Sequence, residues 1–455
     1  MPYHFRPFDR EQMFLLPPSL ADWLPEDHLA YFIADAVEQL DLRAFFKGYR
    51  EDGTGCAAYH PRMMVALLLY GYCTGTRSSR KIERACLEDV AFRILAANQR
   101  PDHATLCRFR QEHEQALEAL FTEVLRLCHA AGLVQVGVVV LDGTTVKAQA
   151  ALEANRTLEG LRAEAQRMLA AAAAEDARED ALYGQAKRGD ELPEELRGRR
   201  SRRARLKECQ ERLEREAVQA RAEQAEKIAT RERAEAERGE KLRGRKPRPP
   251  EAAVDLEAKA NVTDPESRIM KTRRGYVQGY NAQAVVTEAQ IVIAADVTTE
   301  ENDRRQLQPM LEQARANLQA LKVRRKIGVA LVDAGYWSAA NARWERRGRP
   351  ELLIATEKDW KQRRGIQPEQ IPRGRIPKGL TRKERMERKL RTKRGRQLYR
   401  KRGLTVEPLF GQVKEGLSGG RCSRRGQQAT RSEWRFTCAA SNLLKLWRSG
   451  RAVWN

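Results

Sequence analysis

Three acidic residues that lie far apart in the chain stand where predicted secondary structure elements end or begin. Asp142 follows the apolar run VVVL, Asp333 follows GVALV, and Glu407 lies in TVEPLFGQVK at a predicted helix start, with Pro408 in its first turn. Two-metal cleavage of a phosphodiester needs carboxylates on rigid elements, because each Mg²⁺ prefers octahedral oxygen ligation and the ions stand about 3.5 to 4 Å apart. These acids are therefore the candidate catalytic residues and the candidate ligands of two Mg²⁺ or Mn²⁺ ions.

Each acid also has a simpler explanation when it is taken alone. Asp142-Gly143 is typical of a type I′ hairpin turn, and Asp333-Ala-Gly would fit another turn. Glu407 would fit an exposed carboxylate near a helix N-terminus, where the helix dipole favours negative charge. Only the convergence of all three acids would favour a metal site.

The elements around these acids predict a mixed α/β sheet. The β-branched run at residues 136–150 predicts a buried strand, and further strands are expected in GYNAQAVV, IVIAADVT, IGVALVDAG and ELLIAT. Residues 302–322 have helical spacing and lie between the third and fourth of these five strands. Strands followed by alternation with helices indicate one α/β domain, which we place at residues 132–150 and 257–455.

Residues 1–131 predict an all-helical domain that binds DNA. Apolar residues recur three or four apart in DHLAYFIADAVEQL, RMMVALLLYGYC and ALEALFTEVLRLCHAAG. Between them, two helical stretches joined by short turns carry basic residues near their starts, as in a DNA-reading helix pair. These basic residues are Arg77, Arg80, Lys81, Arg108 and Arg110. A helical bundle with a solvated basic face is the alternative.

Residues 151–256 interrupt the sheet domain with strong helix formers and few large apolar residues. A narrow apolar seam at Leu206, Cys209, Leu213, Ala217 and Ala220 predicts an inserted helical arm. A disordered linker is the competing interpretation. Residues 361–403 form a second basic segment, which we interpret as a DNA-tracking loop or a flexible connector.

Charge and composition indicate the class of partner. Lys and Arg number 85 against 62 Asp and Glu, which gives a net charge of +23 and predicts a polyanion such as nucleic acid. The eight cysteines include no C-x-x-C pair, which argues against a zinc site and a disulfide framework. No apolar window approaches the roughly 20 residues that a membrane helix needs, so we expect a cytoplasmic protein without a membrane partner.

The phrases LDGTTVKA, VDAGYWS and YRKRGLTVEPLFGQVK together resemble bacterial insertion-sequence transposases of the DDE type. The opening residues 5–33 and the block at 264–286 are also similar to that family, so the resemblance runs nearly from end to end. It implies a ribonuclease-H-like catalytic core, with Asp142, Asp333 and Glu407 as the acidic triad. Asn281, in GYNAQ, is also similar to the family and is expected to be structural or to lie near the site.

The family signature spaces Tyr, Arg, Glu and Lys by two, three and six residues. Tyr399, Arg402, Glu407 and Lys414 keep the first and last gaps, but four residues separate Arg402 from Glu407. The resemblance implies that Tyr399 and Arg402 contact a phosphate or an end base. Lys414 lies seven residues after Glu407, and this spacing would place both on one face of a regular helix, toward the same DNA backbone.

The resemblance also implies a reaction and a set of partners. One ion would activate a water that attacks the phosphodiester at the element end, the other would stabilise the leaving 3′ oxygen, and the DNA 3′-hydroxyl would then attack target DNA. The expected partners are double-stranded DNA, with terminal inverted repeats and a target, and a second copy of the chain in a synaptic homodimer. The expected location is the nucleoid.

Three other functions are possible in principle, and one of them stays open. A relaxase-type nuclease needs a His-x-His metal pair, and the six histidines contain none. A catalytically silent DNA-binding protein derived from a transposase stays open, because intact acids indicate competence and not activity. A basic coiled-coil scaffold would explain the inserted helices but not the acids at the strand ends.

Overall fold

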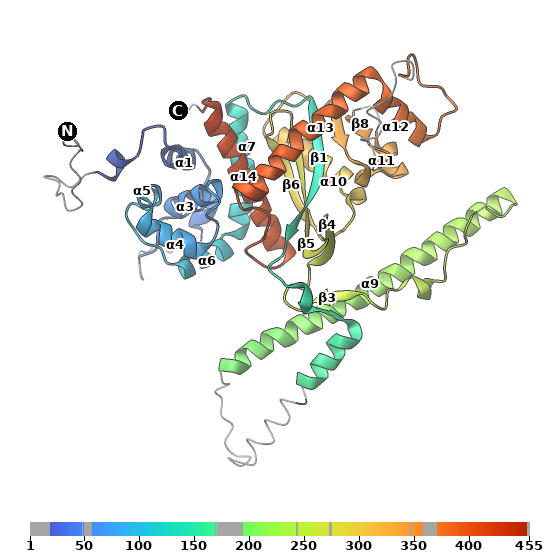
Figure 1. The fold of residues 1–455 in the computed structure, drawn as a ribbon, viewed down its shortest axis with the longest axis horizontal. Coiled ribbons are helices and arrows are strands. Elements are labelled where there is room, and N and C mark those ends of the chain that lie inside the picture. The colour runs from blue at the N-terminus through green and yellow to red at the C-terminus, as the bar shows by residue number, and fades with distance from the viewer. Residues whose placement is uncertain are drawn as a thin grey trace, which may run out of the picture.

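A computed structural model describes residues 19–47, 49, 57–168, 170, 194–242, 244–272, 275–345, 348–357 and 371–452. It contains a block of short helices, a mixed sheet covered by longer helices, and a long helical arm that projects from the body (Figure 1). None of the described helices is long and apolar enough to cross a bilayer.

The N-terminal block is helical, as predicted. Its central helix α3 begins with Pro61 at the first helical position, where a missing N–H is tolerated, and the His60 imidazole accepts a hydrogen bond from the Arg62 amide. Almost every residue of α3 is buried, so the other helices surround it. The helices are α1 (Leu29–Glu38), α2 (Arg43–Phe46), α3 (Pro61–Cys73), α4 (Ser79–Glu88), α5 (Val90–Leu95), α6 (His103–Glu112) and α7 (Glu114–Ala130).

The sheet has the mixed arrangement of a ribonuclease-H-like core. Strand β1 (Val138–Lys147) lies between β5 (Gly275–Thr287), which is antiparallel to it, and β7 (Val329–Val332), which is parallel. Strand β6 (Val292–Thr298) pairs antiparallel with β5, and β8 (Glu351–Ile354) pairs parallel with β7. Strand β4 (Arg268–Thr272) pairs with the first half of β5. The predicted fold class is confirmed, and β4 is an addition that the sequence pattern did not indicate.

Strand β1 is longer than its apolar run suggests. Val139 to Leu141 pair with both neighbours and are buried, as is Val138, which pairs with β7. Beyond them the strand continues to Lys147 along β5. Asp142 is therefore inside a strand, at the first position beyond the end of β7, and it is not in a hairpin turn. The continuous pairing with β5 explains the difference, because it satisfies the backbone of the polar residues that follow Leu141.

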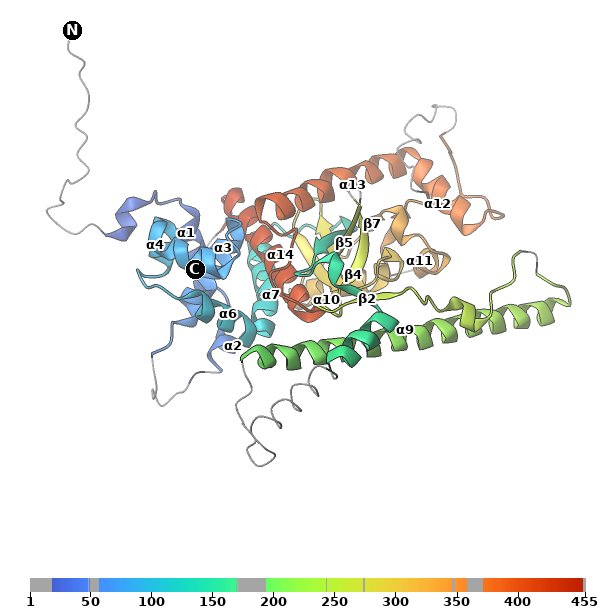
Figure 2. The ribbon, with the colours of Figure 1, turned by 60° about the horizontal axis from the view of Figure 1, so that its bottom comes forward.

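Helices cover both faces of the sheet. Figure 2 shows α13 (Lys393–Gly411) crossing one face, with α10 (Leu307–Ala320) on the opposite one. Helix α14 (Gln427–Ser449) packs mainly against the edge strand β6. The prediction that residues 361–403 form a loop or connector is wrong from residue 382 onward. There α12 (Arg382–Arg391) buries Met386 and Leu390, and α13 follows; residues 361–370 lie outside the described part. The short α11 (Ala339–Trp344) packs against α10 and α12.

Glu407 does not begin a helix, contrary to the sequence interpretation. Helix α13 begins at Lys393, where the Thr392 hydroxyl accepts from the Gly395 amide at 3.0 Å, and Glu407 lies far inside it. Pro408 is tolerated although it has no N–H for the Leu404 carbonyl. The Gln290 side-chain amide donates to that carbonyl at 3.3 Å instead. A π-helical turn, Gln412–Gly416, follows α13.

The insertion is a helical arm on a two-stranded neck. Strand β2 (Asn155–Thr157) pairs antiparallel with β3 (Lys259–Asn261), so the chain leaves and re-enters the core side by side. Helix α9 (Glu194–Arg238) has 45 residues and is roughly 68 Å long. Leu206, Cys209 and Leu213 of the predicted seam pack with Leu161, from a helical stretch at residues 158–168, in a separate small core. The helical interpretation of the arm is confirmed for its described residues.

The helical block and the sheet share one continuous hydrophobic core. Helix α14 packs against α3, α7 and β6, and a buried ion pair crosses the same junction. The Arg77 guanidinium contacts Glu433 of α14, donates to the Ser418 carbonyl at 2.5 Å and lies over the Tyr72 ring. Arg77, predicted to bind DNA, is only 7% exposed in this position. Its side chain joins the two parts of the molecule.

Replacing Arg77 by Met should lower the free energy of unfolding by about 3–5 kcal/mol, because it leaves the Glu433 carboxylate buried without its cation. Arg80→Met, on the exposed start of α4, is the matched control and should change stability by less than about 0.5 kcal/mol. Urea denaturation of both variants measures the difference. Equal, small effects would mean that the ion pair does not hold the junction.

Candidate active site

Asp142 and Asp333 meet at the end of two parallel strands. Leu141 is paired with Val332. The residue after Leu141 and the residue after Val332 are both aspartates, so the two acids lie at the same level of the sheet. The Arg402 guanidinium lies between the two carboxylates, with its Nη2 2.6 Å from Asp142 Oδ2 and 3.9 Å from Asp333 Oδ2. Two aspartates that are distant in the sequence therefore share one cation.

Arg402 reaches the acids because it belongs to the sheet-facing side of α13. Tyr399, Arg402, Val406 and Leu409 recur three or four apart, which is one face of a helix, and all except Arg402 are buried there. The Tyr399 hydroxyl donates to the Val332 carbonyl at 3.2 Å and so fixes the helix to the residue before Asp333. Tyr399, expected to contact DNA, lies 6% exposed beneath the acids.

Burial makes both aspartates costly to ionise. It raises the pKa of Asp142 to about 7, with a further rise from the charges of Asp333 and Asp303 and an opposing effect of Arg402. The pKa of Asp333 is also raised, first by burial and then by Asp303, against the effect of Arg402. Burial alone would lower the pKa of Arg402, but the nearby carboxylates outweigh it and raise that pKa. A positively charged group beside the two aspartates therefore stabilises their ionised form.

A fourth acid, Asp303, was missed by the sequence analysis. It begins the short helix η4 (Asp303–Arg305) after β6, inside the stretch interpreted as the start of a helix. Its Oδ1 accepts from the side-chain amides of Asn281 at 2.8 Å and Gln283 at 2.7 Å. The Tyr336 hydroxyl of the DAGY turn donates to the Gln283 amide oxygen. The available signal was Asn281, which was expected to be structural or to lie near the site, and which donates a hydrogen bond to Asp303.

Glu407 occupies a different position from the two aspartates. Its five-residue separation from Arg402 turns it about 140° around the helix from the sheet-facing arginine. Val406, where the three-residue gap of the family signature would place the glutamate, is fully buried instead. Glu407 is exposed, although its charge contributes to the raised pKa of Arg402. The extra residue in the signature thus has a direct structural consequence.

The predicted basic residues divide into buried and exposed groups. Arg110 is buried like Arg77, and its guanidinium donates to the Arg77 carbonyl at 2.6 Å. Arg80, Lys81 and Arg108 are exposed on α4 and α6, which pack against each other.

Lys414 is half-buried in the π-helical turn, so Glu407 and Lys414 do not share a face of one regular helix. Burial lowers the pKa of Lys414, and the charge of Lys147 on β1 lowers it further.

The acids have the ligand chemistry of a divalent metal site. Asp142 and Asp333 offer the carboxylate oxygens that Mg²⁺ and Mn²⁺ prefer, on adjacent strand ends, and a guanidinium lies where a cation is required. In this arrangement no three His, Cys, Asp or Glu side chains among the described residues are close enough to hold one ion. Arg402 would have to move for Asp142 and Asp333 to bind the same metal.

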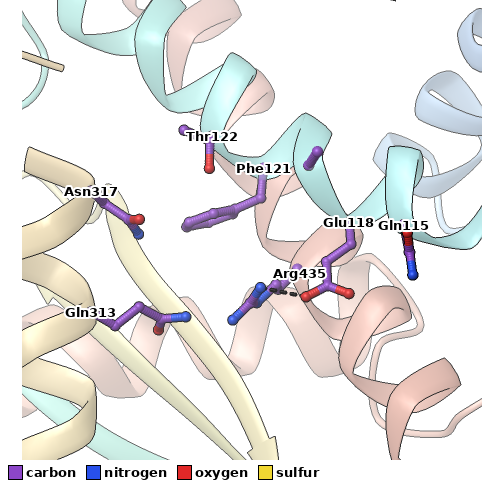
Figure 3. Close-up of a pocket in the computed structure, with 8 residues that line it drawn as sticks. Gln115, Glu118, Phe121, Thr122, Gln313, Asn317 and Arg435 are labelled. Carbon is purple, nitrogen blue, oxygen red and sulfur yellow. Dashed lines mark hydrogen bonds and ion pairs between the residues drawn. The ribbon is translucent and has the colours of Figure 1, made fainter. Parts of the chain in front are cut away.

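A separate pocket lies between α7, α10 and α14 (Figure 3). It is lined by polar side chains such as Gln313 and Asn317, and an ion pair between Glu118 and Arg435 closes one side. None of the predicted site residues lines it, so it is not part of the acidic site.

Comparison with known protein families gives two matches. Residues 18–112 match the model described as "Transposase domain (DUF772)", and residues 243–443 match the one described as "Transposase DDE domain". The second range includes Asp333, Arg402 and Glu407, whereas Asp142 lies outside both. No curated protein and no solved structure matches the chain.

In a metal-free buffer, Asp142→Asn should make the protein more stable at pH 8 by roughly 2–4 kcal/mol. The folded pKa of about 7 exceeds the ordinary value of 3.8, so the wild type loses stability as the pH rises from about 4 to 7, whereas Asn cannot ionise. Thermal unfolding with EDTA at pH 5 to 8 measures this, and the stability difference should shrink toward pH 4.

Asp296→Asn on β6 is the control for an Asp to Asn change outside the acidic cluster. An Asp142→Asn protein that is less stable than the wild type at every pH would show that the ion pair with Arg402 outweighs the cost of burial.

Proposed function

Because the chain belongs to the insertion-sequence transposases of the DDE type, we propose that it cuts DNA at the ends of an insertion sequence and joins these ends to target DNA. The family implies a DNA-binding, metal-dependent enzyme. The observation that carries the proposal for this chain is that Asp142 and Asp333 lie side by side, where β7 ends beside β1, and both contact the Arg402 guanidinium. We propose these two acids and Glu407 as the catalytic residues that hold two Mg²⁺ or Mn²⁺ ions.

The ions would act as Lewis acids on the attacking and leaving oxygens of the phosphodiester. Asp142 and Asp333 would supply ligands whose strand positions are fixed by backbone pairing. Glu407 of α13, which is exposed and turned away from them, would have to reorient to complete the set. Arg402 neutralises the aspartates while the chain is free of metal and DNA. Once released from Asp142, its guanidinium is placed to bind a phosphate, for which its planar fork of donors is well suited. Tyr399 positions α13 and so sets where Arg402 and Glu407 lie.

Double-stranded DNA is the proposed partner, as terminal inverted repeats and as target. Arg80, Lys81 and Arg108 form an exposed basic surface on α4 and α6 that supports DNA contact by the helical block. Lys147 at the end of β1 and the nearby Lys414 of the π-helical turn add positive charge beyond the acids. A homodimer would hold the two element ends together, and action on this DNA supports a location at the nucleoid.

A catalytically silent DNA-binding protein is the alternative. Two observations favour it: Arg402 occupies the position between the acids, and Glu407 is turned away from the sheet. Such a protein would bind element ends with or without metal and never cut them.

Asp142→Asn, Asp333→Asn and Glu407→Gln should each reduce cleavage of DNA that carries the terminal repeats by at least about 100-fold, because a metal contributes several kcal/mol to the transition state. DNA binding in a gel-shift assay with EDTA should stay within a few-fold of the wild type. The cleavage assay needs Mg²⁺ or Mn²⁺ and reads strand scission on a denaturing gel. A wild-type protein that shifts DNA but never cuts it would favour the silent protein.

Replacing Arg80, Lys81 and Arg108 together by Ala should weaken DNA binding uniformly across sequences. The slope of log Kobs against log salt should become shallower by about 0.9 for each DNA phosphate that the variant no longer neutralises. The control is Arg84→Ala on α4, because the Arg84 guanidinium is already paired with Glu88 at 2.8 Å. An unchanged slope in the triple variant would place the DNA surface elsewhere.

A further inference from the structure

We propose that residues 241–248, at the outer end of the helical arm, bind the phosphate backbone of the duplex DNA that enters the acidic site. This segment is called the basic ribbon below. The inference rests on the proposed function, since it takes DNA as the substrate, and it assigns a role to a part of the insertion that the proposed function does not use. It is carried by the charge of the segment, by the contacts that hold its backbone, and by its course along α9.

The positive charge of the outer arm is concentrated in the basic ribbon. Its sequence, KLRGRKPR, contains five basic residues and no acid. The adjoining part of α9, residues 208–238, has nine Glu against seven Arg and Lys, so this part of the helix has no excess of positive charge. The ribbon is therefore a local basic surface, and such a surface predicts a polyanion as its partner.

The basic side chains of the ribbon point to solvent. Lys241, Arg245, Lys246 and Arg248 are exposed, and within the described ranges none of these four side chains forms an ion pair or a hydrogen bond. The neighbouring acid Glu235 is already engaged, because it accepts from the Arg231 guanidinium at 2.8 Å and from a backbone amide of the ribbon at 3.1 Å. The four charges are thus available to phosphates.

The backbone of the ribbon is fastened to α9 by two side chains. The Arg231 side chain is only 18% exposed and donates to the carbonyls of Leu242 at 2.6 Å and Arg245 at 3.0 Å. The Gln224 amide donates to the Arg248 carbonyl at 2.8 Å. The basic side chains therefore extend from a backbone that is already ordered, which reduces the entropy lost when they bind a partner.

The inner end of the ribbon lies close to the acidic site. Arg248 is held at Gln224, and the preceding residue of α9, Glu223, pairs with Arg305 at 3.4 Å. Arg305 belongs to η4, the short helix that begins with Asp303. A duplex with its scissile phosphate at the aspartates would therefore pass near this end of the ribbon.

From there the ribbon runs outward along α9, whose outer end projects beyond the sheet in Figures 1 and 2. Its outer end lies at Glu235, which accepts from the Leu242 amide. Residues 224 and 235 are 11 residues apart, which is about 16 Å of helix. One strand of B-DNA advances about 3.4 Å per nucleotide, so the ribbon has the length of about five phosphates. This length fits a contact with the DNA that flanks the cleavage position.

The experiment measures binding of the full chain to duplex DNA that carries the terminal repeats, in EDTA and over a range of salt concentrations. Arg245, Lys246 and Arg248 are replaced together by Ala. The slope of log Kobs against log salt should become shallower by about 2 to 3, since each phosphate contact contributes about 0.9. Circular dichroism should show an unchanged fold, because Arg231 and Gln224 hold the backbone of the ribbon and not its basic side chains.

The matched control replaces three exposed basic residues that precede β7, at the end of this strand opposite to the acids: Arg324, Arg325 and Lys326. Its salt slope should stay close to that of the wild type. Equal slopes in the two variants would overturn the role of the ribbon. If the ribbon variant keeps the wild-type slope and the wild type cuts this DNA, only the further inference fails. A wild type that does not bind the DNA at all refutes the proposed function as well.

A second measurement uses the wild type and does not depend on the folding of a variant. Duplex DNA should protect Lys241 and Lys246 from acetylation by an amine-reactive reagent several-fold more than it protects Lys326, as read by mass spectrometry. Equal acetylation with and without DNA would refute the contact. Phosphatidylserine vesicles at the same phosphate concentration serve as the comparison, and stronger protection by vesicles than by DNA would overturn the assignment to DNA.

Discussion

The parallel pairing of β1 with β7 is the constraint on which the rest of the site depends. It places two aspartates at neighbouring strand ends, where apolar residues on both sides of the sheet have already excluded much of the water. Two carboxylates in such a place repel each other and cost free energy when ionised. Two groups offset this repulsion. Arg402 contacts the aspartates from one side of the sheet, and side-chain amides of β5 donate hydrogen bonds to Asp303 on the other.

Support for the acids comes from buried residues next to them. Tyr399 fixes α13 to β7 by a hydrogen bond to the Val332 carbonyl. This position of α13 brings the Arg402 guanidinium, three residues later, into contact with Asp142. Tyr336 and Gln283 connect the turn after β7 to β5 and then to Asp303. Because such hydrogen bonds in a poorly solvated site are strong and directional, the carboxylates keep their positions despite their mutual repulsion.

The sequence predicted those features that depend on local pattern. The strands, the helical block and the arm have periodicities that show which face is buried, and the acids after apolar runs marked the sheet edge. Asp303 was not predicted, because nothing local separates an acid before a helix from a solvated helix cap. Arg77 and Tyr399 were misplaced for a related reason: a basic or aromatic residue on an exposed-looking segment becomes buried only when a distant element, here α14 or β7, packs on it.

The position of the insertion follows from the same geometry. The arm leaves the core after β1 has passed the acids, and its neck is tied to the strand that supports Asp303. The Asn155 amide donates to the Gln278 side chain of β5 at 2.9 Å, and Arg212 of α9 donates to the Lys259 carbonyl at 2.7 Å. Gln278 lies three residues before Asn281 on one continuous strand. The arm is therefore attached to β5, the strand whose amides orient Asp303, whereas an insertion before Asp142 would have broken the pairing with β7 that brings the aspartates together.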